Sequence, residues 1–177
     1  LVVLAVNGRD QLFLWLFVAL AISDWVDGKL AILLNQHSIW GPSLDSWADA
    51  GLYLALLIGA VLLRGDVLQS ELKWILPALG SYGFSTLAGC WKYRRWPSYH
   101  TRAAKTSWFL ILVGAGCLFG GWNLWPLRMA LAAVILTNLE ALLITTLVPG
   151  WRSDVGSVFQ ILRERARHRV KKNHPLR

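Results

Sequence analysis

Residues Ser107–Val148 read SWFLILVGAGCLFGGWNLWPLRMALAAVILTNLEALLITTLV, an almost unbroken apolar run. A helix needs about 20 mostly apolar residues to cross a membrane core about 30 Å thick, so this run is too long for one crossing. Gly120, Gly121 and Pro126 interrupt it and favour a turn. The stretch therefore predicts two membrane-spanning helices joined by a short connection.

Working outward from this stretch, three more apolar runs are long enough to cross a membrane. They are Gln11 to about Leu34, Trp47–Leu63 and Leu72–Cys90. The opening Leu1–Val6 is apolar but too short, and we interpret it as the tail of a first span that is mostly missing here. A composition of 55% hydrophobic residues with 11 Trp exceeds what a soluble domain of this length needs. We predict an all-α polytopic membrane helix bundle with five whole spans and one partial span.

The positive charges indicate how this bundle is oriented. Most of the 18 Lys and Arg residues lie in the loop Trp91–Ser107 and in the tail after Pro149. Cytoplasmic segments carry the excess of Lys and Arg, so both segments should be cytoplasmic, and counting spans back places Asp24–Asp49 on the same side. We expect residues 1–150 to form the transmembrane domain, in a bacterial inner membrane, and residues 151–177 to form a basic cytoplasmic tail.

The basic charge does not by itself indicate a nucleic-acid partner. No surface that combines basic and aromatic residues for base reading is evident outside the apolar runs. Topology and attraction to anionic membrane lipids account for the charge without further assumptions. The tail segment Val155–Val170 has the pattern of a basic amphipathic helix on the membrane surface.

Two pairs of aspartates stand at the predicted ends of neighbouring spans. Asp24 and Asp27 are three residues apart, Asp45 and Asp49 are four apart, and either spacing places a pair on one helical face. Four carboxylates crowded near a membrane stay ionised together only if cations neutralise them. Oxygen ligands of this kind select Mg²⁺, Mn²⁺ or Ca²⁺, and paired ions clamp the attacking and leaving oxygens in phosphoryl transfer. The aspartates therefore predict a divalent-metal site.

Two other classes of protein could use such acids. Solvated interfacial acids would need no regular spacing, yet four of the ten acids fall in this one segment at helical intervals. A divalent-cation transporter would carry polar residues deep in several spans, near the membrane midplane. Here the aspartates lie at helix ends, which favours an enzyme site over a permeation path.

This segment resembles the motif of the CDP-alcohol phosphatidyltransferase family, D-x-x-D-G-x-x-A-R followed by G-x-x-x-D-x-x-x-D. The matching positions are Asp24, Asp27, Gly28, Ala31, Gly41, Asp45 and Asp49. The motif arginine is Ile32 in this chain, and Lys29 could supply part of the missing positive charge. Ile32 leaves a non-catalytic, metal-binding family member as an alternative.

The resemblance implies a six-span enzyme that transfers a phosphatidyl group from CDP-diacylglycerol to an alcohol and releases CMP, a step in phospholipid biosynthesis. It implies Mg²⁺ or Mn²⁺ as cofactor, a homodimer, and Asp49 as general base. The implied metal ligands are Asp24, Asp27, Asp45 and Asp49, and the implied substrate-binding positions are Gly28, Ala31 and Gly41. Small residues at Gly28 and Ala31 would let a nucleotide approach the helix, although close helix packing is an equal explanation.

The acceptor alcohol is indicated less directly. Lys105-Thr106 is similar to the Lys-Thr of phosphatidylglycerophosphate synthases, and a pocket formed with Arg102 would suit a phosphorylated acceptor such as glycerol 3-phosphate. Inositol phosphate, serine and other alcohols remain alternatives. Glu140 lies within the last apolar run, where an acid often marks function, but the sequence assigns it no role.

Overall fold

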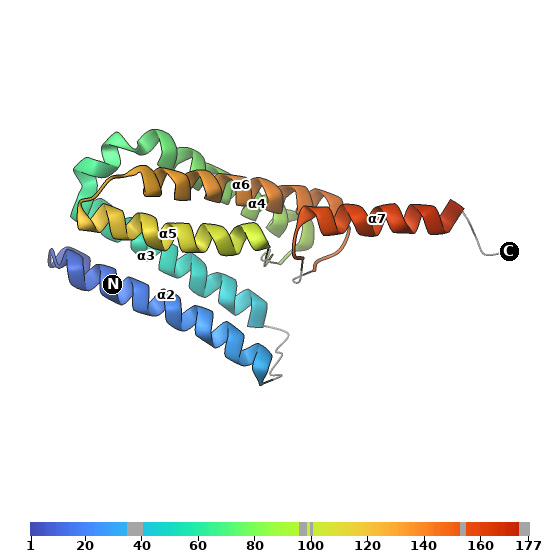
Figure 1. The fold of residues 1–177 in the computed structure, drawn as a ribbon, viewed down its shortest axis with the longest axis horizontal. Coiled ribbons are helices and arrows are strands. Elements are labelled where there is room, and N and C mark those ends of the chain that lie inside the picture. Colours follow the sequence, from blue (N-terminus) through green and yellow to red (C-terminus); the bar gives the residue numbers. More distant parts are fainter. Residues whose placement is uncertain (35–40, 96–98, 100, 153–154, 174–177) are drawn as a thin grey trace.

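The computed structural model describes residues 1–34, 41–95, 99, 101–152 and 155–173, and these residues form helices without any strand. Figure 1 shows the helices arranged as an elongated bundle. In chain order they are α1 (Val2–Val6), α2 (Asp10–Leu33), α3 (Gly41–Ser70), α4 (Leu72–Tyr93), α5 (Arg102–Gly120), α6 (Trp125–Leu147) and α7 (Val158–Asn173). The predicted all-α membrane bundle is confirmed.

The long apolar run divides where the sequence predicted. Helix α5 ends at Gly120, and Gly121 follows it with φ +68°, a left-handed conformation that favours glycine. Helix α6 begins at Trp125, with Pro126 in its first turn, where a missing amide hydrogen costs nothing. In the described residues three helical segments are long and apolar enough to cross a membrane, namely Trp47–Ser70, Arg102–Gly120 and Trp125–Leu147.

Helices α2 to α6 alternate in direction, so each end of the bundle collects particular segments (Figure 1). One end holds the C-terminus of α2, the start of α3, the start of α5 and the whole of α7. We call this the basic end, because the loop after α4 and the tail both lie there. The segments predicted to share the cytoplasmic side therefore do lie at one end of the molecule.

The core joins α2, α3 and α5 through aromatic packing. Phe13 of α2 is fully buried, and its ring stands 5.2 Å from that of Phe119 of α5 between ring centroids. A Cβ atom at Gly59 of α3 would lie only 2.1 Å from the Phe13 ring. Glycine is therefore required at this position, because any side chain would displace the aromatic ring from the core.

The sequence ended one apolar run at Leu63 and began the next at Leu72, and the structure corrects the connection implied between them. Helix α3 continues to Ser70, with a kink at Arg64, where φ is −138° and ψ is 33°. The Arg64 guanidinium donates to Asp10 Oδ2 at 2.9 Å and to the Phe119 carbonyl at 2.6 Å. These bonds tie the kink to the start of α2 and the end of α5, so the chain bends without leaving the helix.

An ion pair with a buried carboxylate lies at the end of the bundle opposite the basic end. Arg128 of α6 forms a two-pronged bond with Glu71, with Nε 2.8 Å from Oε2 and Nη2 2.7 Å from Oε1. Glu71 is only 2% exposed and directly precedes α4. Hydrogen bonding from Arg128 lowers the pKa of the Glu71 carboxyl against the opposing effect of burial.

We expect Glu71→Ala to lower the free energy of unfolding by more than the loss of an exposed ion pair does, because it removes two charge-assisted hydrogen bonds between Arg128 and a buried carboxylate. The lowered pKa sets the pH dependence. The contribution of the ionised Glu71 carboxylate to the free energy of unfolding is complete above the ordinary pKa of a carboxyl group. This contribution is lost as the pH falls through the lower pKa of Glu71 in the folded state. Unfolding of the detergent-solubilised protein, followed from neutral to acidic pH, measures both effects.

The matched control for Glu71→Ala is Glu164→Ala, which removes the exposed pair between Glu164 and Arg152 at 2.9 Å. An exposed pair of this kind contributes about 0–1 kcal/mol. Equal losses of stability from the two variants would contradict a special role for the buried pair.

Candidate active site

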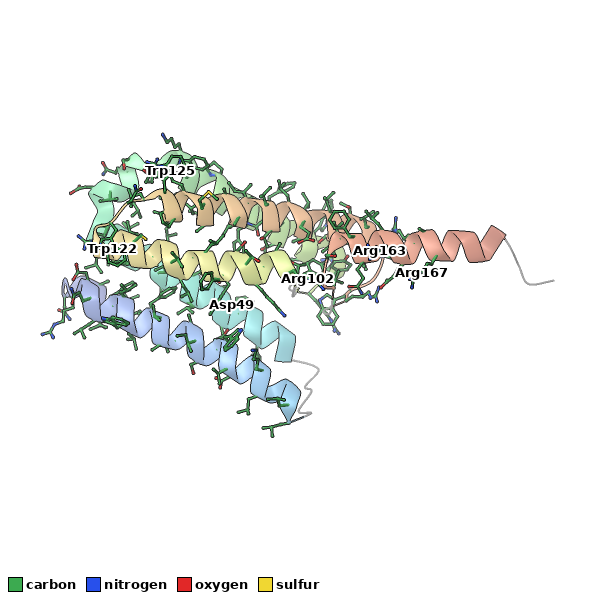
Figure 2. The ribbon with its side chains drawn as sticks, viewed as in Figure 1. Asp49, Arg102, Trp122, Trp125, Arg163 and Arg167 are labelled. Carbon is green, nitrogen blue, oxygen red and sulfur yellow. The ribbon has the colours of Figure 1, made fainter. Side chains whose placement is uncertain are left out.

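The four aspartates stand in the halves of α2 and α3 nearer the basic end, and each pair lies within one helix. Asp24 is nine residues before the end of α2 and Asp49 is eight residues after the start of α3, so the sequence analysis placed both too close to the helix ends. Asp24 and Asp49 are half-buried, whereas Asp27 is exposed. Their helices meet at this end because α2 finishes at Leu33 and α3 starts at Gly41. Figure 2 places Asp49 on α3, towards the end of the bundle where α5 starts.

Two of these carboxylates lie within electrostatic range of a tyrosine that the sequence analysis did not consider. Asp49 and Asp24 both lie close enough to the Tyr53 hydroxyl to interact with it electrostatically. Asp49 interacts in the same way with Tyr82 of α4. Acids from α2 and α3 therefore share one polar region with phenols from α3 and α4.

The sequence carried a signal for one of the two tyrosines. Tyr53 follows Asp49 by four residues, so both must lie on one face of α3. Tyr82 belongs to a different helix, and only the packing of α4 brings it near Asp49. No local pattern could have indicated that contact.

Part of the predicted site lies outside the described side chains. Those of Gly28, Ala31, Ile32, Gly41 and Asp45 are in this group, although their backbones belong to α2 and α3. Among the side chains that are described, no three acids, histidines or cysteines form a group that could hold a metal. The four-carboxylate metal site thus stays a prediction. Carboxylate oxygens such as those of Asp24 and Asp49 are the type of donor that divalent cations such as Mg²⁺ prefer.

Lys29 has a specific partner in the structure. Its ammonium nitrogen lies 3.8 Å from the centroid of the Trp25 ring, one turn earlier on α2. This distance is typical of a cation–π contact. The lysine charge is thus held over Trp25, seven residues before Ile32, the position where the family motif has its arginine.

The first turn of α5 carries the predicted acceptor-binding residues. Arg102 and Lys105 are exposed there, at the same end of the bundle as Asp49 (Figure 2). The turn is fixed by Thr101, whose buried hydroxyl accepts a hydrogen bond from the Ala104 amide at 3.1 Å. A capped helix start of this kind holds both cationic side chains on a rigid base.

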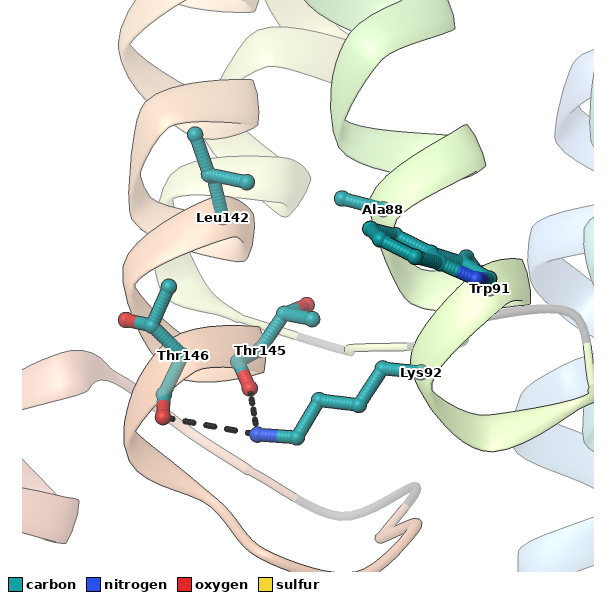
Figure 3. A pocket seen from close by; sticks show the side chains of 6 residues that line it. All are labelled: Ala88, Trp91, Lys92, Leu142, Thr145 and Thr146. Carbon is teal, nitrogen blue, oxygen red and sulfur yellow. Dashed lines mark hydrogen bonds between the residues drawn. The ribbon is translucent and has the colours of Figure 1, made fainter.

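A groove of about 390 Å³ between α4 and α6 also opens at this end (Figure 3). It is lined by Ala88, Trp91, Lys92, Leu142, Thr145 and Thr146, which include none of the predicted site residues. The Lys92 ammonium donates to the carbonyls of Thr145 at 2.5 Å and Thr146 at 3.4 Å. Lys92 therefore satisfies the last carbonyls of α6, where a cation is favoured.

Comparison with known proteins identifies the domain that holds this site. The family model for CDP-alcohol phosphatidyltransferases matches residues 1–153, which include the four aspartates and the start of α5. The chain belongs to this family. Its members transfer a phosphatidyl group from a CDP-alcohol to an alcohol acceptor, so the chain belongs to a class of transferases of phospholipid biosynthesis. No curated protein and no solved structure matched the chain.

Proposed function

We propose that this family member is a metal-dependent enzyme that transfers a phosphatidyl group from CDP-diacylglycerol to a phosphorylated alcohol. The reaction takes place at the cytoplasmic face of a bacterial inner membrane. The observation that carries the proposal is that Asp24 and Asp49, from the two helices that hold the family motif, both lie within electrostatic range of Tyr53 in the domain matched by the family model. Both aspartates stand in the half of their helix nearer the basic end, the side from which a lipid-linked nucleotide and a water-soluble acceptor would approach.

The aspartates would hold the cofactor, Mg²⁺ or Mn²⁺. Asp24, Asp27 and Asp45 are its expected ligands, with Asp49 available as a fourth. When bound, such cations neutralise phosphate charge and stabilise the leaving group. The half-buried setting of Asp24 and Asp49 supports this assignment, because ionised carboxylates at the edge of a membrane need a compensating charge.

Asp49 is also the proposed general base. The acceptor oxygen attacks the phosphorus of the phosphatidyl group, the bond to the bridging pyrophosphate oxygen breaks, and CMP departs with that oxygen. The acceptor proton passes to the Asp49 carboxylate. Tyr53 of α3 and Tyr82 of α4 both lie within electrostatic range of this carboxylate.

Arg102 and Lys105 support a phosphorylated acceptor such as glycerol 3-phosphate. Both are exposed on one turn of α5, and charge-assisted bonds from such residues recognise phosphate. Inositol phosphate has the same chemistry, whereas serine would make less use of the two cations.

A non-catalytic family member is the second candidate, and it rests on Ile32 in place of the motif arginine. We expect the working unit to be a homodimer.

The test is CMP release by the full chain in lipid vesicles that contain CDP-diacylglycerol. We expect release to require Mg²⁺ or Mn²⁺ and an acceptor, with glycerol 3-phosphate or inositol phosphate favoured over serine by roughly tenfold. A chelator provides the control for the metal. An equal rate of CMP release with and without an acceptor would contradict the transfer reaction. Protein that binds CDP-diacylglycerol but releases no CMP with any acceptor would establish the non-catalytic alternative.

A further inference from the structure

The chain turns back after α6, and α7 starts beside Glu140, about two turns before the end of that helix. The Val158 amide, the first of α7, donates to Glu140 Oε1 at 3.0 Å. Further along, the Arg165 guanidinium donates to the Leu147 carbonyl. Both helices advance by seven residues between these two contacts, so the first turns of α7 run parallel to the last turns of α6. Figure 1 shows α7 continuing outward from there, beyond the end of the bundle.

Apolar side chains seal this junction. Val155, before α7, is 1% exposed, and Ile161, on α7, is 3% exposed. Both pack against Ile144 and Val148 at the end of α6, together with Tyr99 from the loop before α5. The Tyr99 hydroxyl also lies 3.0 Å from Thr145 Oγ1. The tail is thus built into the bundle as a packed element.

The same junction holds the start of α5. The Arg102 amide, the first of α5, donates to the Gly156 carbonyl at 3.1 Å. Gly156 stands two residues before Val158, so the segment that Glu140 fixes is also the segment that Arg102 contacts. Displacement of the start of α7 would therefore displace the turn that carries Arg102 and Lys105.

Glu140 occupies the centre of this arrangement. Its Oε1 receives the first amide of α7, where the helix end carries a partial positive charge that favours an acid. Among the described atoms its Oε2 is buried without a hydrogen-bond partner. A carboxylate buried at such cost has a use that packing alone would not require.

We propose that Glu140 is a positioning residue for the acceptor end of the active site. It fixes the start of α7, and the segment before α7 fixes the first turn of α5. This inference rests on the proposed function in one respect, the role of Arg102 and Lys105 in acceptor binding. It extends the active site to α7, which lies beyond the residues matched by the family model.

The test compares Glu140→Ala with Glu140→Gln. The alanine variant loses the acceptor oxygen, whereas glutamine keeps an oxygen that can receive the Val158 amide. We expect Glu140→Ala to raise the acceptor KM by roughly tenfold, since displacements of about 1 Å can cost up to about 10²-fold. The KM for CDP-diacylglycerol should stay nearly unchanged, and Glu140→Gln should recover most of the loss. Leu143→Ala, on the exposed face of α6, is the matched control.

Hydrogen exchange at residues 101–106 gives a second readout that does not need activity. Faster exchange there in Glu140→Ala, but not in Leu143→Ala, supports the proposal even if the wild type releases no CMP and the proposed function fails. Unchanged exchange together with an unchanged acceptor KM would overturn it. Equal rises in both KM values with a loss of thermal stability would also overturn it, because the role would then be structural only.

Discussion

Asp49→Asn is expected to lower CMP release by roughly 10²–10⁴-fold, the usual span for loss of a general base. Asparagine keeps an oxygen of similar shape, so it preserves most contacts with a bound cation and with the neighbouring tyrosines. It cannot take the proton of the attacking alcohol. Binding of CDP-diacylglycerol should therefore largely survive while turnover collapses.

The measurement pairs binding of CDP-diacylglycerol with CMP release, for wild type and variant, over a titration of Mg²⁺ or Mn²⁺. Activity of the wild type must be established first, because Ile32 replaces the motif arginine. Asp66→Asn is the matched control, since Asp66 is an exposed aspartate of the same helix beyond the kink. An Asp49→Asn variant that loses donor binding and regains activity with added cation would identify Asp49 as a ligand and refute its role as base.

The fold could be predicted largely because membrane helices are encoded locally. Apolar length fixes each span, and the glycines and proline near residue 120 fix the break in the longest run. The kink at Arg64 could not be predicted, because it depends on Asp10 and on the Phe119 carbonyl, which are remote in the sequence. The ion pair between Glu71 and Arg128 could not be predicted for the same reason.

The same distinction between local sequence patterns and contacts of remote residues applies to the candidate site. Helical spacing placed each aspartate pair on one face, and it would also have placed Tyr53 beside Asp49. Only tertiary packing brings Tyr82 to Asp49, and only the fold of the tail brings Gly156 to the start of α5. The role of Glu140 could not be predicted from the sequence, because its partner is a backbone amide of α7, and every residue type except proline has such an amide.

The second large effect is expected for Asp24→Asn, which weakens the proposed metal site directly. Mutation of residues that merely support metal ligands already costs about 10–100-fold in metal affinity, so loss of a ligand should cost roughly 10²-fold or more. At limiting cation both donor binding and CMP release should fall together. High Mg²⁺ or Mn²⁺ should restore part of each, because mass action refills a weakened site.

The two variants therefore separate ligand from base at positions whose carboxylates share the surroundings of Tyr53. Asp24→Asn should shift the cation dependence and keep a substantial maximal rate, whereas Asp49→Asn should keep the cation dependence and lose the maximal rate. Both properties follow from one titration of CMP release against Mn²⁺. An Asp24→Asn variant with unaltered cation dependence would remove Asp24 from the ligand set. The carboxylate would then owe its half-buried place to contacts within the bundle, and the cation would have to rest on the remaining aspartates.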